Sequence, residues 1–551
     1  MAATVAGRRA DSRPDSRPDR RPDRRPPKAA SATRTVVVAE PAWVDLAVAL
    51  VLAGGVALRF ITTSPLWLDE ALSVNIASEP WSDIVGRLLR DGAPPLYYFA
   101  LKSWMLVFGS SDFAVRSMSG FFAMAALPLM WMAGNRLNRR EGGWTAVVLL
   151  ASSPFALRYA TEARMYSLVI LLTALGVVLL NRFLDRPTAP LLAGIIVTVG
   201  ALALTHYWTL YLLGALLLVL ALRSDRAKPW ERSAVRFPTS WAMLGIGAGL
   251  LSFVPWASTF WYQAQHTGTP WAGPLGASTP VAAVLSFGGS GAEAASLLGL
   301  SLVLLALLGA FARRLDPRAD QRLVLLDLRG SSPGRNIGLL VVLTLVLATV
   351  AGIVVGGAFQ PRYASVVLVP FLLLVALGVC TIGAVRVRRV VVTTVAFLGL
   401  IVGVAGAGQQ RTQAGELAGI LASRSQPGDV VLYCPDQLAP AMDRRLENLG
   451  VRGRLRQLTY PDLGPPRFID WVDYEERMKA SQPEGVARRV HERAAGFNIW
   501  FVWSPAYRVP AGKCGELNAH LNNVRPDWRN VAILAGDGRF EVANLTVYPP
   551  G

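Results

Sequence analysis

Two carboxylates stand side by side in the first polar segment that follows an apolar run. Asp69 and Glu70 occur in Trp67-Leu-Asp-Glu-Ala, shortly after the apolar run 42–60. On a helix these neighbours would point about 100° apart, so they cannot both address one atom closely. We expect one of them to act on a substrate while the other holds the segment. The alternative interpretation is a pair of helix-start carboxylates favoured by the helix macrodipole.

A second cluster of chemically active side chains occupies Arg158-Tyr-Ala-Thr-Glu-Ala-Arg-Met-Tyr166. Arg158, Glu162 and Tyr166 are spaced four apart and would share one face of a helix, with Arg164 on another. An arginine near a membrane boundary is costly and usually has a carboxylate or phosphate partner. The cluster therefore suits phosphate binding, although Glu162 could simply pair with Arg158.

Three further positions carry weaker signals. Asp91 precedes Gly92 and a Pro-Pro pair, so it is either a substrate contact or a turn residue. Arg116 and Arg362, the latter followed by Tyr363, open apolar runs and could bind a lipid phosphate or snorkel to the surface. No metal site is predicted, because no paired-Cys or His-x-x-x-His spacing occurs, and His206 is expected to pack rather than to bind metal.

The composition places these residues in a membrane protein with soluble parts. Of 551 residues, 52% are hydrophobic and 17% are charged. Apolar runs near the ~20 residues of a membrane-spanning helix predict a mainly α, polytopic fold of about eleven spans. The predicted spans are 42–60, 113–134, 143–158, 166–184, 189–205, 207–223, 239–256, 292–312, 337–358, 364–384 and 390–407.

Basic residues predict the orientation of these spans, since Lys and Arg accumulate in cytoplasmic loops. The net charge of +18 comes mostly from a tail and from short loops between apolar runs, so no nucleic-acid partner is predicted. The predicted inner loops carry Arg136, Arg139, Arg140, Arg182, Arg186, Arg223, Arg226, Lys228, Arg232, Arg236, Arg313, Arg314, Arg318, Arg322, Arg386, Arg388 and Arg389. The alternation holds if the apolar stretch 95–109, with Lys102 in its middle, forms an interfacial or re-entrant helix instead of crossing.

Three regions follow. Residues 1–40 contain a Ser/Arg-Arg-Pro-Asp repeat and are predicted to be a disordered basic cytoplasmic tail. Residues 41–408 form the transmembrane region. Residues 409–551 are predicted to be a small extracytoplasmic α/β domain, with a helix at 416–423, strands at 429–433 and 498–503, and a helix at 486–495. Cys434 and Cys514 could form one disulfide there, whereas Cys380 lies in an apolar run.

Five short motifs, in order, resemble one family. Trp67-Leu-Asp-Glu-Ala, Ala93-Pro-Pro-Leu-Tyr-Tyr, Phe113-Ala-Val-Arg-Ser, Glu162-Ala-Arg-Met-Tyr and Pro361-Arg-Tyr are similar to glycosyltransferase family 39 within the GT-C membrane enzymes. That family includes protein O-mannosyltransferases and the aminoarabinose transferase of lipid A. The resemblance covers about residues 42–410. Asp91 and Ala93 depart from it, because relatives often carry Glu-Lys or Gly-His before the prolines.

The resemblance implies a multi-pass enzyme of the plasma membrane with a polyprenyl-phosphate sugar donor. It further implies an inverting hexosyl or pentosyl transfer, of mannose or another cell-envelope sugar, to a lipid, glycan or protein acceptor on the outer face. Asp69, with Glu70 beside it, matches the position of the acidic residue that acts on the acceptor. Arg158, Arg164 or Arg362 would then lie near the phosphate, where arginines rather than a cofactor stabilise the leaving group.

The alternative function is a polytopic transporter of a lipid-linked or small polar substrate. Transporters place polar groups near the membrane midplane, often in two related halves. Here the ionisable residues collect on one predicted face, and no internal repeat is evident. A membrane scaffold that captures a partner through its outer domain is a further alternative.

Overall fold

The computed structural model describes residues 42–225, 232–268, 275–289, 293–313, 325–328, 333–355, 359–509, 511–536 and 538–550. The predicted basic tail at 1–40 lies outside these residues. So do Arg226, Lys228, Arg314, Arg318 and Arg322 of the predicted inner loops.

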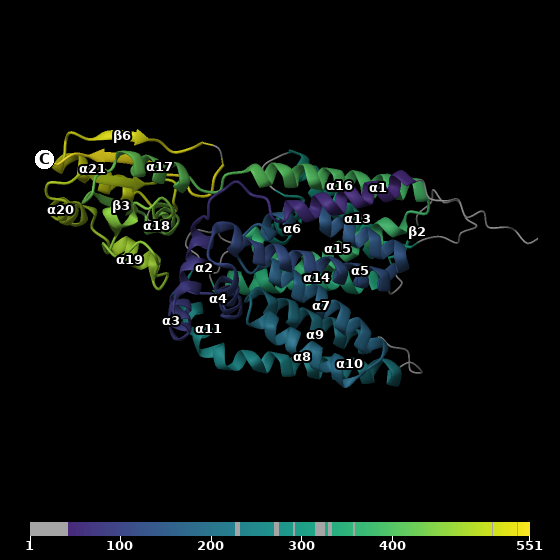
Figure 1. Ribbon diagram of the computed structural model, residues 1–551. Coiled ribbons are helices and arrows are strands. Elements are labelled where there is room, and N and C mark those ends of the chain that lie inside the picture. The colour runs from purple at the N-terminus through teal and green to yellow at the C-terminus, as the bar shows by residue number, and fades with distance from the viewer. Residues whose placement is uncertain are drawn as a thin grey trace, which may run out of the picture. The chain divides into compact units, whose positions relative to one another are not determined.

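The described residues up to Gly408 form helices almost throughout (Figure 1). The α-helices are α1 (Ala42–Leu58), α2 (Leu68–Ser78), α3 (Trp81–Asp91), α4 (Leu96–Phe108), α5 (Asp112–Ser152), α6 (Pro154–Ala160), α7 (Tyr166–Asp185), α8 (Ala189–Ala203), α9 (Trp208–Asp225), α10 (Arg232–Leu250), α11 (Ala257–His266), α12 (Thr279–Leu285), α13 (Glu293–Phe311), α14 (Pro333–Val355), α15 (Ser365–Thr381) and α16 (Val385–Gly408). Three 3-10 helices and a small antiparallel pair of strands complete this part: η1 (Leu251–Trp256), η2 (Ser286–Gly288), η3 (Pro361–Ala364), β1 (Ala312–Arg313) and β2 (Leu325–Leu326).

Seven helical segments in the described part of the chain are long and apolar enough to cross a membrane. Several of them also have apolar outward faces, as on α14, where Val342 is 57% and Val354 is 78% exposed. Side chains of this kind suit contact with lipid rather than with water. The predicted multi-pass helical fold is confirmed, while the number of crossings stays a prediction, because five further apolar helices are shorter.

The predicted spans 113–134 and 143–158 meet in one long element, α5. Asn138 and Arg139 have non-helical backbone angles, and the chain reverses there into a helical hairpin. The arms pack closely, since a methyl group on Gly134 would lie 2.5 Å from the carbonyl oxygen of Gly142. The second arm stops at Ser152, because Ser153 caps a new short helix, α6, through its side chain.

The centre of the helical part is α15, which packs against α5, α7, α13 and α14 and is buried over nearly its whole length. Glycine allows the closest of these approaches. A methyl group on Gly309 of α13 or Gly378 of α15 would lie 2.0 or 1.8 Å from a backbone oxygen of the facing helix. Small residues bring helices together in this way inside membranes, where hydrophobic burial supplies no force between them.

The segment between α1 and α5 folds into α2, α3 and α4, which lie at the ends of the long helices (Figure 1). Helix α2 is buried along nearly all of its length and carries Asp69 and Glu70 in its first turn. Helix α4 has 13 residues, about 20 Å at 1.5 Å per residue, which is short of the ~30 Å hydrocarbon core. This length fits the prediction that 95–109 does not cross.

After Gly408 the chain forms a five-stranded mixed sheet with helices on both faces. Its strands are β3 (Val430–Cys434), β4 (Arg456–Thr459), β5 (Ile499–Trp503), β6 (Arg529–Ala532) and β7 (Asn544–Tyr548), in the order β4-β3-β5-β7-β6. Strands β3, β4 and β5 are parallel, and β7 is antiparallel to β5 and β6. The helices are α17 (Ala414–Arg424), α18 (Ala439–Asn448), α19 (Tyr474–Ala480), α20 (Pro483–Arg493) and α21 (Lys513–Val524), with short turns η4 (Asp436–Leu438) and η5 (Arg452–Arg454).

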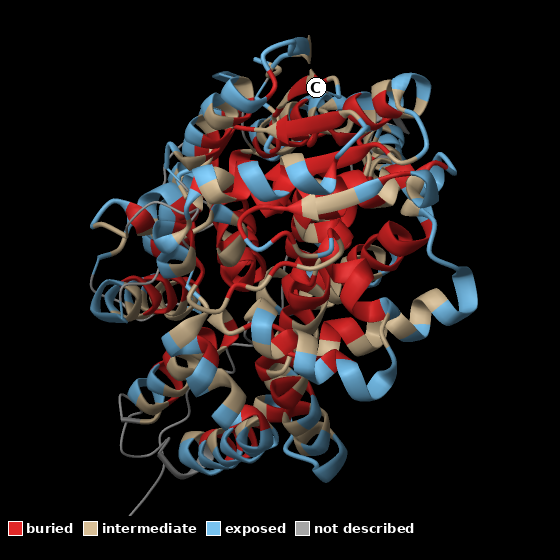
Figure 2. Ribbon diagram, turned by 90° about the vertical axis from the view of Figure 1, so that its left-hand side faces the viewer, coloured by how far each residue is buried: buried red, intermediate tan, exposed pale blue. Residues whose placement is uncertain are grey.

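The strands predicted at 429–433 and 498–503 are therefore confirmed as β3 and β5, and the predicted helices as α17 and α20. Both central strands are almost fully buried, as expected for parallel strands covered on two faces. Figure 2 shows these buried residues continuing through the middle of the sheet and of the helical part, with exposed residues on the outer turns.

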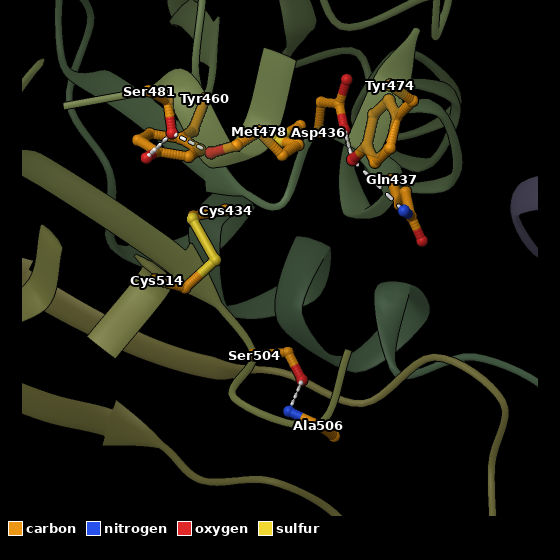
Figure 3. Close-up of a disulfide and its surroundings, with 10 residues drawn as sticks. All are labelled: Cys434, Asp436, Gln437, Tyr460, Tyr474, Met478, Ser481, Ser504, Ala506 and Cys514. Carbon is orange, nitrogen blue, oxygen red and sulfur yellow. Dashed lines mark hydrogen bonds between the residues drawn. A yellow bond between two sulfur atoms is a disulfide. The ribbon is translucent and has the colours of Figure 1, made fainter. Parts of the chain in front are cut away.

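A disulfide joins Cys434, at the carboxyl end of β3, to Cys514 in the first turn of α21 (Figure 3). Both cysteines are buried, and 80 residues of sequence separate them. The bond fixes the segment that leads from β5 into α21 against the end of β3. Cys380 is a free, buried cysteine in α15.

Candidate active site

A cavity of about 540 Å³ lies where the helical part meets the sheet. One wall is apolar and comes from α1, α6 and α16, with Leu58, Leu157, Val402, Gly403 and Ala407 among its lining residues. The opposite region is polar and includes Asp69, Arg158, Glu162, Arg362 and Glu541. The cavity therefore suits a ligand that has an apolar part and a charged or polar part.

Asp69 reaches this cavity from the first turn of α2. Its Oδ2 lies 3.2 Å from Nη1 of Arg362, and the two side chains are 17% and 15% exposed. Arg362 enters from η3, above the central helix α15, and its guanidinium also lies over the ring of Trp67, 5.6 Å from the centroid. Oδ2 of Asp69 and Nε of Arg362 are buried without a hydrogen bond. Both groups thus keep capacity for a ligand.

Glu70 is turned the other way and is fully buried. Its Oε1 accepts from Nε of Arg116 at 2.7 Å, and its Oε2 accepts from Nη2 of Arg116 at 2.5 Å. The Ala163 amide donates to Oε1 at 2.9 Å, and Nη1 of Arg411 lies 3.7 Å from Oε2. Burial alone would raise the pKa of Glu70, but Arg116, Arg411 and the Ala163 amide hold this pKa below its usual value.

All three guanidinium nitrogens of Arg116 already donate to groups within the protein. Besides Glu70, its guanidinium donates to the carbonyl oxygens of Ser64 at 2.7 Å and Pro65 at 3.0 Å. Neither Arg116 nor Glu70 lines the cavity. Arg116 and Glu70 thus form a structural tie between α2 and α5, while the predicted phosphate contact of Arg116 and the catalytic part of Glu70 stay predictions.

Arg158 and Glu162 both line the cavity, but α6 ends at Ala160 and the next helix begins at Tyr166, so the predicted shared helix face with Tyr166 does not form. Arg158 Nη2 lies 3.4 Å from Oε2 of Glu162, and the guanidinium lies 5.0 Å from the ring centroid of Phe540. Nη1 of Arg158 is buried without a hydrogen-bond partner. Burial raises the pKa of the Glu162 carboxyl, although the charge of Arg158 opposes the shift.

Arg164 and Asp91 belong to a different group of side chains. Arg164 donates through Nη1 to Ser73 Oγ at 3.0 Å and to the Tyr98 hydroxyl at 3.4 Å, and Tyr98 donates to Asp91 Oδ2 at 2.8 Å. None of the four lines the cavity of Asp69. Asp91 lines a separate cavity of about 500 Å³ beside Arg87, Arg90 and Arg467. Arg164 and Asp91 therefore lie outside this cavity, although both interact electrostatically with Asp69, and Arg164 also interacts with Arg362.

Tyr166 and Tyr363 form an aromatic row behind the site. Ring centroids are 4.8 Å apart for Tyr159 and Tyr166, 5.9 Å for Tyr166 and His206, and 5.5 Å for His206 and Tyr363. His206 packs in this row, as predicted. Over the residues described, no group of three or more His, Cys, Asp or Glu side chains could hold a metal ion.

Four residues in or near the cavity were not predicted from the sequence: Trp67, Tyr507 and Glu541, which line it, and Arg411, which lies beside Glu70. Arg411 is 1% exposed and donates to the Thr161 backbone oxygen at 2.8 Å and to the Thr161 hydroxyl at 2.7 Å. Its place directly after the last apolar run was a usable signal, since arginines at that boundary usually have partners. Tyr507 and Glu541 lie in polar loops without periodicity, where the sequence holds no such signal.

Residues 92–259 match the family model described as dolichyl-phosphate-mannose-protein mannosyltransferase. The chain is similar to crystal structures of ArnT from Cupriavidus metallidurans, in the apo state with a TM-score of 0.56 and bound to undecaprenyl phosphate with a TM-score of 0.54. Identity is 13% in both comparisons, which cover 92% of this chain and 98% of that chain. An Archaeoglobus fulgidus oligosaccharyltransferase is also similar, with 11% identity, a TM-score of 0.47, and coverage of 83% of this chain and 68% of that chain. No curated protein matches the sequence. The likeness to ArnT shows a shared fold over nearly the whole of both chains.

Proposed function

We propose that this chain is a membrane glycosyltransferase of the GT-C type that moves a sugar from a polyprenyl-phosphate donor to an acceptor hydroxyl on the outer face of the membrane, with Asp69 as the base. The family match at 92–259, which includes three of the five motifs, and the fold shared with ArnT support the resemblance drawn from the sequence. The sugar, the acceptor and the role of Asp69 belong to the proposal.

The cavity is the observation that carries the proposal. A polyprenyl-phosphate sugar has a long apolar chain, one phosphate and a polar sugar. The cavity offers an apolar wall next to three arginines and three carboxyl groups, namely Arg158, Arg362, Arg508, Asp69, Glu162 and Glu541. Arg158 and Arg362 each retain a buried nitrogen without a hydrogen-bond partner. A phosphate would supply the missing acceptors. ArnT, whose fold this chain shares, has been crystallised with undecaprenyl phosphate, which supports a lipid phosphate here.

The reaction asks little of the protein beyond positioning and charge. Asp69 takes the proton of the acceptor hydroxyl while the hydroxyl oxygen forms a bond to the anomeric carbon. At the same time the bond between the anomeric carbon and the phosphate oxygen breaks. The anomeric configuration inverts, because attack and departure occur on opposite faces. The departing polyprenyl phosphate gains one negative charge, and guanidinium groups fixed beside it stabilise that charge most in the transition state.

We place the cavity and the sheet on the outer side of the membrane. The alternation of basic loops in the sequence supports this orientation. The Cys434–Cys514 disulfide supports it independently, because such bonds persist in oxidising compartments and are rare in the cytosol.

The proposal is tested by incubating purified protein in detergent with a panel of polyprenyl-phosphate sugars and measuring released polyprenyl phosphate. We expect turnover with at least one donor, faster when its acceptor is present. No turnover with any donor, in a sample with an intact disulfide and a cooperative thermal transition, would contradict the proposal and favour the transporter alternative.

A further inference from the structure

One wall of the cavity comes from the C-terminal sheet and its loops. Tyr507 and Glu541 line the cavity there, together with Gln437 and Phe540. Phe540 packs against Trp67 of the first loop, with ring centroids 5.3 Å apart. This wall faces Asp69, Arg158 and Arg362, and no step of the transfer described above uses it.

Three side chains in this wall or packed against it have buried polar atoms that the protein does not fully satisfy. The Tyr507 hydroxyl and the Trp67 indole nitrogen make no hydrogen bond within the described protein. The Glu541 carboxyl is approached by the Thr412 side chain and the Leu68 amide, but neither contact has the geometry of a full hydrogen bond. Glu541 is 4% and Trp67 is 7% exposed. A buried polar group without a partner costs about 1–3 kcal/mol, so a group of them beside a cavity indicates a ligand or ordered water.

The position of Glu541 is fixed by the backbone on both sides. Its amide donates to the Arg411 carbonyl oxygen at 3.2 Å, and its carbonyl accepts from the Gln413 amide at 2.9 Å. Arg411 is in turn anchored to Thr161 in the loop that follows α6. Glu541 is therefore a rigid part of the wall rather than a side chain on a free loop.

The sheet presents its ligand-binding edge to the cavity. Gln437 follows the carboxyl end of β3, and Tyr507 follows the carboxyl end of β5. Glu541 precedes β7, whose first residue, Asn544, pairs with Trp503 at that same edge. Strand β4, which follows β3 in the chain, lies on one side of β3, and the next strand, β5, lies on the other side. The carboxyl ends of β3 and β5 therefore form a topological switch point. Ligands of open α/β sheets bind at such points.

Near the disulfide, hydrogen bonds fix the Gln437 side chain and the turn at Ser504–Ala506, which leads to Tyr507 (Figure 3). The Gln437 side chain is held by a hydrogen bond from its amide to Tyr474 at 3.2 Å. Ser504, directly after β5, accepts from the Ala506 amide at 3.2 Å in the turn that leads to Tyr507. Cys434 and Cys514 join the ends of these segments, so the wall is ordered before a ligand arrives.

The chemistry of the wall selects for hydroxyl groups. Burial raises the pKa of Glu541 to about 8, although Thr412 and the Leu68 amide oppose the shift, so its carboxyl is neutral at pH 7 and can both donate and accept. The Tyr507 hydroxyl can do the same, and the Trp67 indole donates. We propose that Tyr507, Glu541 and Trp67 hold the hydroxyl groups of a sugar ring in this cavity. The proposal rests on the glycosyltransferase function above, and the ring belongs either to the donor or to a glycan acceptor.

The test compares E541A, E541Q and Y507F with wild type. KM and kcat are measured for donor hydrolysis without acceptor and for transfer to a glycan acceptor, and binding of radiolabelled polyprenyl-phosphate sugar is measured without turnover. E484Q, on the exposed face of α20, is the matched control. We expect E541A and Y507F to raise one KM about 3- to 10-fold, the loss of one buried hydrogen bond, with kcat nearly unchanged. A higher KM for the donor assigns the subsite to the donor sugar, and a higher KM for the acceptor assigns it to the acceptor.

E541Q separates a hydroxyl ligand from a cationic one. The amide can still donate and accept, so we expect its KM to stay near the wild-type value. An equal loss in E541Q and E541A would show that an amine is bound and would overturn the inference. Unchanged KM values and unchanged binding in Y507F, which removes only one hydroxyl, would overturn it as well. If wild type binds donor and Y507F weakens that binding, but no turnover occurs, the subsite stands and the proposed function fails.

Discussion

Asp69 and Glu70 show how differently two adjacent carboxylates can be placed. The first turn of α2 directs Asp69 to the cavity and Arg362, and Glu70 into a fully buried pair with Arg116. Helix geometry predicted that the two side chains point apart, and the family resemblance pointed to Asp69 as the acid that acts on the acceptor. The partners of Glu70 could not be predicted, because Arg116 and Arg411 lie far away in the sequence.

The buried pair leads to a prediction about stability. R116A leaves the Glu70 carboxylate buried without its main partner, which typically costs about 3–5 kcal/mol. R136A breaks an exposed pair with Asp185 at 2.6 Å and should cost less than about 1 kcal/mol. Thermal unfolding of both variants in detergent measures the difference. Equal melting temperatures would show that the buried pair does not hold α2.

Glu541 leads to a prediction about pH. Its pKa rises from 4.5 in the unfolded chain to about 8 in the folded protein, so the folded state binds the proton more tightly. Stability from this group is present below pH 4.5 and is lost as the pH rises towards 8. The groups that face it are Thr412, Leu68, Asp69, Glu70 and Tyr507.

We therefore expect E541Q, which cannot ionise, to melt close to wild type at about pH 5 and above it at about pH 9. Melting curves of the two proteins across this range provide the measurement, and E484Q controls for the general effect of losing a carboxylate. A difference in melting temperature between E541Q and wild type that does not change with pH would contradict the assigned titration of Glu541.

At the scale of elements, apolar length and periodicity predicted most of the helical part. The spans at 166–184, 189–205, 207–223 and 390–407 correspond to α7, α8, α9 and α16 within a few residues. The seven-residue helix α12 was missed, because so short an apolar stretch carries no clear period. The break at Ser153 was missed too, since a serine cap inside an apolar run does not lower its hydropathy enough to divide it.

The Cys434–Cys514 disulfide ties α21 to the end of strand β3. C434A/C514A opens a link across 80 residues, so we expect the C-terminal part to lose about 2–5 kcal/mol of stability, and Tyr507 to lose its fixed place. C380A, which removes the buried free cysteine of α15, should leave that part unchanged. The measurement is the rate of limited proteolysis within residues 409–551. Equal protease resistance in the two variants would show that the bond contributes nothing to the sheet.

At the scale of the whole molecule, the site exists only because distant segments meet. Residues from α2, from the loop after α6, from η3 and from the end of the chain line one cavity. The positions of the basic loops in the sequence predicted that the first three of these segments lie on one side of the membrane. It could not place Glu541, since nothing in a polar loop after the last apolar run shows which edge of the sheet faces the helices.

Orientation leads to a prediction for the intact cell. With Cys380 removed and the native disulfide intact, a single cysteine is introduced at E484C on α20 or at R140C in the turn of the α5 hairpin. We expect a membrane-impermeant maleimide to label E484C on intact cells and R140C only after lysis. The reverse pattern would place the sheet and the cavity inside.

The most direct test of the account is the rate of sugar transfer by D69N. With a donor that wild type uses, we expect D69N to keep donor binding and its melting temperature but to lose transfer about 10²–10⁴-fold, the usual contribution of a general base. D83N, which changes an exposed carboxylate on the neighbouring helix α3, should transfer at the wild-type rate. Full transfer activity in D69N would contradict the central claim that Asp69 takes the acceptor proton.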